Sequence, residues 1–214
     1  MFTTMPESTQ GRLTEAEALA ARILQKTGLR TQWSNCRLSQ RRTALNKCAA
    51  ASAGITHLYI RLLSEPMAAK FAASTKMLGV AVATSQGTFP VDAYIFAERV
   101  GFFVEQDRGQ VSHLLGAAIT HEVGHLLLAA NVHTVNGIMS AQWGPREKKD
   151  ALMGVLTFST RQSEQIRADV RQRMSVSNEC PHMADDERVI EPIRDREHRQ
   201  FDACRELRPD PKGQ

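Results

Sequence analysis

The sequence has few of the features that mark disulfide-stapled, membrane-bound or exported proteins. Only four of its 214 residues are cysteine and no two form a C-x-x-C pair, so neither a zinc ribbon nor a thioredoxin-like redox pair is indicated. No stretch approaches the roughly 18 unbroken apolar residues that a membrane span needs. Residues 1–10 lack the basic start and the apolar run of a secretory signal. We therefore expect a cytoplasmic chain without membrane contact, unless the true start lies upstream and supplies an export signal.

Length and composition bound the domain organisation. The chain is long enough for one domain with a substantial core, and its 42% hydrophobic and 23% charged residues are ordinary for a globular protein. Its 27 basic and 23 acidic residues give a net charge of +4 and a pI near 9.0. Residues 177–214, however, contain 7 basic and 10 acidic residues and a single aromatic, Phe201. Because so little apolar surface cannot offset the entropy of ordering, we predict one domain over residues 1–176 and a charged, disordered tail over residues 177–214.

Hydrophobic periodicity predicts an α+β domain. Apolar residues recur at the i, i+3, i+4 spacing of amphipathic helices, and runs rich in β-formers lie between them. Helices are expected over residues 13–26, 110–130 and 160–174, with a loop through Pro145 between the last two. Strands are expected over residues 56–63, 78–83 and 91–97, with a shorter candidate at 31–33. The last helix should present Ile166, Val170 and Met174 on its buried face.

The expected helix over residues 110–130 contains a motif that can carry chemistry. His121, Glu122 and His125 form the pattern H-E-x-x-H. Residues four apart on a helix share a face, about 6 Å apart along the axis, so both imidazoles can bind one zinc ion at about 2.0–2.1 Å. Glu122 lies beside the metal, where it can take a proton from a zinc-activated water and pass it to a leaving amine.

A catalytic zinc needs a third protein ligand and one open position. His133 is the nearest candidate, but on a continuous helix it would lie about 12 Å beyond His125 and about 80° off its face. The helix must therefore end before His133 and the chain must turn back. Asn131 tolerates the left-handed conformation that often terminates helices. Glu147 and Glu164 are alternative third ligands.

The segment that runs from the first histidine of the motif through Trp143, H-E-V-G-H-L-L-L-A-A-N-V-H-T-V-N-G-I-M-S-A-Q-W, resembles the metzincin zinc peptidases. It is most similar to a bacterial group of small metallopeptidases in which H-E-x-G-H-L-L-L-G is followed by a histidine and then a G-I-M turn. The classical metzincin consensus has a glycine and a histidine where this chain has Leu128 and Asn131. His133 comes two residues later, as suits the bacterial group.

This resemblance extends over residues 13–174 and implies a metzincin-like fold. That fold has a small twisted mixed β-sheet with an N-terminal helix, an active-site helix and a C-terminal helix. The resemblance also implies His133 as the third zinc ligand and Met139 as the methionine of the Met-turn, a hydrophobic floor beneath the metal. The strand over residues 91–97 is then the sheet edge that pairs with an extended peptide substrate.

The remaining histidines and large aromatics are expected to have structural roles. Tyr94 and Phe96 fall on the same side of their strand, and packing is the expected role for at least one of them. His113 should be structural or face the solvent, and His57 should be half-buried with its polar atoms satisfied. Trp143 and Phe158 are expected in the core.

The sequence thus predicts a zinc-dependent peptidase that acts on a peptide or protein substrate with Glu122 as general base. The alternative is a non-catalytic domain in which zinc holds the fold together, although such a site gains nothing from an unliganded glutamate. The basic stretch from Arg37 to Lys47 lacks the interleaved aromatics of a nucleic-acid-binding module, so nucleic acid is not favoured as a partner. Nothing in the sequence indicates an oligomeric state. Whether Cys36 pairs with Cys48, or the two later cysteines with each other, also stays open.

Overall fold

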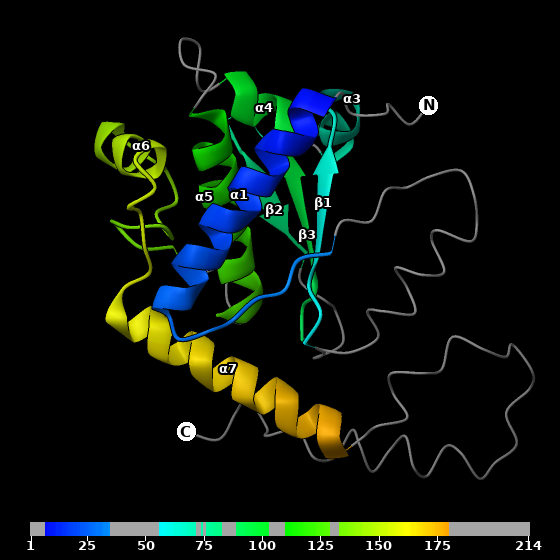
Figure 1. Cartoon of the computed structure of the whole chain (residues 1–214), viewed down its shortest axis with the longest axis vertical. Coiled ribbons are helices and arrows are strands. Elements are labelled where there is room, and N and C mark those ends of the chain that lie inside the picture. Colours follow the sequence, from blue (N-terminus) through cyan, green and yellow to red (C-terminus); the bar gives the residue numbers. More distant parts are fainter. Residues whose placement is uncertain are drawn as a thin grey trace, which may run out of the picture.

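The computed structural model (Figure 1) has mixed α+β architecture with a small three-stranded sheet. It describes residues 7–34, 56–71, 74, 76–82, 89–102, 110–128 and 133–179. Its elements along the chain are α1 (Glu7–Lys26), β1 (Tyr59–Leu63), α3 (Glu65–Ala68), the 3-10 helix η1 (Ala69–Phe71), β2 (Gly79–Ala81), β3 (Asp92–Phe96), α4 (Ala97–Phe102), α5 (Val111–Leu127), α6 (Pro145–Leu152) and α7 (Thr160–Glu179). No helix in these ranges is long and apolar enough to span a membrane.

The sheet has the order β1-β3-β2, with β1 parallel and β2 antiparallel to the central strand. The predicted strands over residues 56–63, 78–83 and 91–97 are therefore confirmed, each somewhat shorter. The prediction that the strand over residues 91–97 forms the sheet edge is wrong. Strand β3 lies between β1 and β2, and β2 pairs with it from Gly79 to Ala81. The edge strand beside α5 is β2.

Helix α1 packs along α5, as Figure 1 shows. The predicted amphipathic face of α1 is buried, and its last residues lead to Gly28, which has φ of +93°. The two helices approach most closely at Gly116. A Cβ there would lie 2.6 Å from the Ala16 carbonyl oxygen and 3.0 Å from Leu19 Cβ. Because a side chain would push the helices apart, this glycine fixes how deeply α5 sits in the core.

The two faces of the sheet have separate apolar partners. Ile95 faces the main core between α1 and α5, whereas Phe96 packs with Leu63 and Ala68 on the other face, where Tyr94 is half-buried. Tyr94 and Phe96 therefore share a packed face, as predicted. On that face the guanidinium of Arg99 lies 4.6 Å from the Phe96 ring and donates to Glu65 through Nε and Nη2, at 2.8 Å each.

Helix α7 confirms the predicted helix over residues 160–174 and continues to Glu179, three residues past the expected domain boundary. Its buried face differs from the prediction. Ile166 is fully buried and Val170 half-buried, but Met174 is 53% exposed and Arg173 is 1% exposed. A guanidinium with three hydrogen bonds is buried where the methionine was expected, so the charged residue is far less exposed than its apolar neighbour.

Several local predictions differ from the structure. Residues 31–33 form no strand, and His57 precedes β1 as an exposed residue rather than lying half-buried in it. Helix α6 occupies a region that was expected to be loop. It begins with Gly144 and Pro145, and Glu147 accepts a hydrogen bond of 3.2 Å from the Gly144 N–H. All four cysteines, the stretch from Arg37 to Lys47 and the tail from residue 180 onward lie outside the described residues.

Candidate metal centre

The H-E-x-x-H motif lies in the last two turns of α5. Most other residues of this helix are buried against α1 and the sheet. His121 and His125 are half-buried, and Glu122 is buried. The polar motif is therefore surrounded by protein on most sides, which desolvates the ionisable groups and leaves limited directions for their side chains.

The three predicted histidine ligands converge. The Nε2 atoms of His121 and His125 are 3.0 Å apart. The ring of His133 lies 5.5 Å from that of His121 and 4.8 Å from that of His125, centroid to centroid. One nitrogen from each ring lies within 4.8 Å of the others, so the cluster could hold a metal ion. Within the described parts of the chain, no other group of three such side chains has this spacing.

The orientation of His121 is fixed by the backbone. Its Nδ1 lies 2.6 Å from the carbonyl oxygen of Ile138, and because a carbonyl only accepts, Nδ1 is the protonated nitrogen. The Nε2 lone pair then points toward His125. Burial, together with the two neighbouring histidines, lowers the pKa of His121 to about 4, although the hydrogen bond to Ile138 raises it. His121 is therefore neutral at pH 7, the form that binds metals.

Helix α5 ends where His133 requires it to end. The helix stops at Leu127, and the C-cap Leu128 donates its N–H to the Gly124 carbonyl at 2.9 Å. The helix thus ends before His133, as predicted, although earlier than the expected residue 130, and the His133 ring faces the other two imidazoles. Asn131 lies outside the described residues. His133 is exposed, so the cluster is open to solvent on its side.

The segment from His133 to Ser140 is held in a compact turn. The Thr134 N–H donates to the Met139 carbonyl at 2.9 Å, and the Ile138 N–H donates to the Thr157 carbonyl at 3.2 Å. Gly137 has φ of +85°, a conformation that other residues rarely adopt. These contacts place the Ile138 carbonyl at Nδ1 of His121, so the same turn orients His121 and carries His133.

Met139 is fully buried against α5. A Cβ on Gly124 would overlap the Met139 sulfur and would lie 2.8 Å from the Phe158 ring. Glycine at position 124 therefore lets the methionine reach the helix backbone next to His125. The role of Met139 as a hydrophobic floor beneath a metal stays a prediction, whereas Phe158 is in the core as expected.

Trp143 forms part of the site as well as of the core. Its ring stands edge-on to His121 with 6.0 Å between centroids. Its Nε1–H donates to the Ile138 carbonyl at 3.3 Å, so this one oxygen accepts hydrogen bonds from both rings. The indole thus limits the movement of His121, a role beyond the packing that the sequence predicted.

Glu122 points toward the edge strand β2. Only 6% of its surface is exposed, and a Cβ on Gly79 would lie 2.8 Å from Glu122 Cγ and 2.9 Å from its Oε1. Burial raises the pKa of Glu122 to about 8, opposed by a hydrogen bond from the Ala81 backbone. The carboxyl is therefore held between α5 and β2 in a space that only a glycine at position 79 leaves open.

The other candidates from the sequence lie elsewhere. His113 Nδ1 is 2.6 Å from the Leu152 carbonyl oxygen, which confirms its structural role. Glu147 caps the start of α6, and Glu164 is exposed on α7. Neither carboxylate belongs to the histidine cluster in the described residues.

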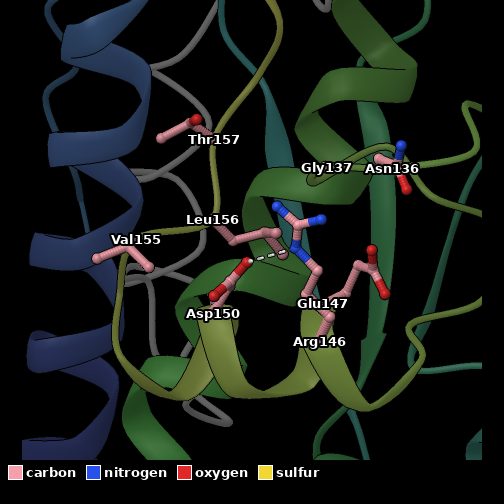
Figure 2. Close-up of a pocket in the computed structure, with 8 residues that line it drawn as sticks. All are labelled: Asn136, Gly137, Arg146, Glu147, Asp150, Val155, Leu156 and Thr157. Carbon is pink, nitrogen blue, oxygen red and sulfur yellow. Dashed lines mark ion pairs between the residues drawn. The ribbon is translucent and has the colours of Figure 1, made fainter.

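A separate hollow of about 150 Å³ lies behind the turn (Figure 2). Side chains of α6 form one wall, and Asn136 and Gly137 lie opposite them. None of the three histidines lines it. Its only ion pair is a long one of 4.0 Å between Arg146 and Asp150, on an exposed surface. We therefore assign no part of the candidate chemistry to this hollow.

Three contributions to the site were absent from the sequence interpretation. These are the Ile138 carbonyl, the space at Gly79 and the indole of Trp143. A glycine inside a predicted strand is a known signal of close approach, so Gly79 had a usable signature. The Ile138 carbonyl had none, because any residue can supply a backbone oxygen.

The chain matches no protein-family model, and neither a curated protein nor a solved structure matches it.

Proposed function

We propose that this protein is a zinc-dependent peptidase of the metzincin type. The observation that carries the proposal is the convergence of His121, His125 and His133 beside a buried glutamate. The first two ligands come from one helix turn, whereas the third comes from a chain that has reversed direction after the helix end. Such an arrangement leaves one side of the cluster open, as a catalytic metal requires.

The donor set fits zinc. At a Zn–N distance of about 2.05 Å, tetrahedral geometry separates two nitrogen ligands by about 3.3 Å, close to the 3.0 Å between the Nε2 atoms of His121 and His125. His121 is neutral and is oriented through Nδ1 by a carbonyl, the usual outer-shell partner of a zinc-bound histidine. Three imidazole nitrogens without a thiolate favour zinc over calcium or magnesium.

Glu122 supplies the proton chemistry. A zinc ion at the three histidines would polarise the peptide carbonyl and lower the pKa of water. Glu122 then accepts a proton from the attacking water and delivers it to the leaving amine. Burial favours the protonated carboxyl, whereas a nearby dication favours the carboxylate. The carboxyl is thus placed where both protonation states are accessible during turnover.

Strand β2 is the proposed docking strand for the substrate backbone. The Val82 N–H donates to the Asp92 carbonyl and the Phe96 N–H to the Leu78 carbonyl. In an antiparallel ladder such bonds occur at every second residue, so the backbone groups of Gly79 and Ala81 point away from β3. The Ala81 backbone already donates to Glu122, so an extended peptide can pair on that side through Gly79, which would bring its scissile bond beside Glu122. This assignment replaces the one made from the sequence for residues 91–97.

Metal content and peptide digestion of the purified chain test the proposal. The wild-type chain should hold about one zinc ion and cleave members of a peptide library. His121→Ala and His125→Ala should lose both properties. His113→Ala is the matched control, since it removes a histidine from the same helix whose ring binds only the Leu152 carbonyl. Stoichiometric zinc in the double variant at 121 and 125 would contradict the proposal, and zinc without any peptide cleavage would favour a structural metal site.

A further inference from the structure

Helix α7 crosses the C-terminal ends of both α1 and α5, as Figure 1 shows. One arginine reaches each end. Arg167 Nη1 donates to the Thr27 carbonyl just after α1 at 2.8 Å, and Arg173 Nη2 donates to the Leu126 carbonyl in the last turn of α5 at 2.6 Å. The two arginines thus make the same kind of contact at two different helices.

The contacts of Arg173 extend further than those of a simple helix cap. Its side chain is 1% exposed, and Nε lies 2.6 Å from Asp169 Oδ2. Nη1 donates to the Pro90 carbonyl at 3.1 Å, and the guanidinium carbon lies 4.7 Å from the centre of the Phe89 ring. A planar guanidinium can satisfy three acceptors in fixed directions, which a lysine cannot do.

The hydrogen bond to Leu126 bears on where α5 ends. In a continuing helix the Leu126 carbonyl would accept the N–H of residue 130. Arg173 supplies a donor to that carbonyl, so it remains satisfied although the helix stops at Leu127. The stop at this point is what allows His133 to return to His121 and His125.

The other contacts link the same helix end to the sheet. Phe89 and Pro90 lie immediately before β3, the strand that holds β2 in register. Strand β2 in turn contacts Glu122 through Gly79. One buried guanidinium therefore touches both halves of the site: the helix end that precedes His133, and the sheet whose edge holds the glutamate.

We propose that Arg173 is a positioning residue for the metal centre, which it keeps in place by fixing the end of α5 against the start of β3. This inference rests on the proposed function in so far as the cluster binds zinc. Arg167 provides the contrast, because it makes an equivalent bond at the end of α1, where none of the candidate ligands lies. Replacing either arginine should lower the stability of the fold, but only replacing Arg173 should change the metal centre.

The experiment compares Arg173→Met with Arg167→Met in the full chain. Zinc affinity is measured by competition with a chromogenic chelator, and amide hydrogen exchange is measured on the zinc-free proteins. For Arg173→Met we expect zinc affinity to fall by about ten-fold, the lower end of the loss seen when a direct partner of a ligand is removed, because Arg173 acts on His133 only through the end of α5. Its exchange should quicken over residues 124–128 and 133–140. For Arg167→Met the zinc affinity should stay at the wild-type value and faster exchange should be confined to the end of α1.

Wild-type zinc affinity in Arg173→Met would overturn the inference, as would an equal loss in Arg167→Met. Should the wild-type chain itself bind no zinc, the proposed function fails, and the exchange measurement alone then decides whether Arg173 holds the end of α5. If Arg173→Met is not recovered as folded protein, Arg173→Lys and Arg167→Lys are compared in the same two measurements, with the same direction expected because lysine cannot reach all three acceptors.

Discussion

The two faces of α5 are built in opposite ways. Toward α1 the helix is apolar and so closely packed that Gly116 cannot carry a side chain. Toward β2 and the turn after His133, it presents two imidazoles and a carboxyl, all partly or fully buried. Burial on the first face stabilises the fold by roughly 25 cal/mol per Å² of apolar surface. Burial on the second face opposes the charged forms of its residues, as the pKa values of about 4 for His121 and about 8 for Glu122 indicate.

This difference suggests how a small domain can maintain a polar site inside its core. The contacts with α1 and α7 hold the helix in place. The opposite face, with His121, Glu122 and His125, is the ligand face and need not contribute to stability. Sites with polar groups held in a desolvated setting commonly depend on such support from elsewhere in the fold. Substitutions on the two faces should therefore separate function from stability.

The largest expected effect is on the ligand face, at Glu122. Glu122→Gln should reduce peptide hydrolysis by about a hundred- to ten-thousand-fold, because an amide cannot take the proton from water. Zinc content should stay at the wild-type value, since the carboxyl is not among the three ligands. The two measurements are the steady-state rate on a cleaved library peptide and the metal content of the same sample. If Glu122→Gln hydrolysed the peptide at the wild-type rate, the proposed role of Glu122 as general base would be wrong.

The next effect tests the space that β2 leaves for the glutamate. Gly79→Ala would place a Cβ within 2.9 Å of the Glu122 carboxyl, so either the glutamate or the strand must move. We expect a fall in hydrolysis of about ten-fold or more, since small misplacements of a catalytic group are costly, with zinc retained. Gly101→Ala in α4 is the control, because a Cβ there meets no atom within 4 Å. Equal activity of both variants with wild type would show that Gly79 has no such role.

On the packed face the expected effect is on stability alone. Gly116→Ala should destabilise the fold by about 1–3 kcal/mol, the usual result of overpacking a core, because the added methyl group meets the Ala16 carbonyl at 2.6 Å. Gly11→Ala, also in a helix but with open space around it, should be neutral or stabilising by up to about 1 kcal/mol. Urea unfolding of both variants measures this. If Gly116→Ala lost zinc at full stability, the separation of the two faces would be wrong.

The sequence predicts those features of the fold and site that have a regular residue spacing. The helices over residues 7–26, 111–127 and 160–179 show apolar periodicity, and the H-E-x-x-H spacing places two histidines on one face. The helix end before His133 was predicted from the reach that a third ligand needs. The start of α6 also had a signature, Gly144-Pro145 followed by Glu147, which the loop interpretation overlooked.

What the sequence did not reveal arises from contacts between distant segments. Charged residues are buried only when paired, so Arg173 looked like a surface residue and Met174 like a core residue; the acceptors at Leu126 and Pro90 reverse this order. The position of β2 could not be predicted either, because a three-residue strand can pair on either side of the sheet. No local pattern specifies that choice, because it is decided by what α5 leaves uncovered.

The smallest effect is expected away from both faces of α5, at Glu65. The hydrogen bond from Arg99 lowers the pKa of this carboxyl below its ordinary value of 4.5. A lowered pKa in the folded state means that the ion pair stabilises the protein above that value and that this contribution is lost as the pH falls below it. Glu65→Gln should therefore unfold at slightly less urea than wild type at pH 7, with the two midpoints converging in acid. Both proteins are measured with a metal chelator present, so that zinc does not contribute.

The expected difference is modest, because Glu65 is about one-third exposed and solvent screens the pair. The amide of the variant can still accept a hydrogen bond from Arg99, which also donates to the Ser74 carbonyl. Glu164→Gln, at an exposed position of α7, controls for the loss of one negative charge. A midpoint difference that persists unchanged in acid would mean that Glu65 acts through packing rather than charge. In that case a carboxylate that is about one-third exposed would stabilise the fold by packing, as the apolar face of α5 does.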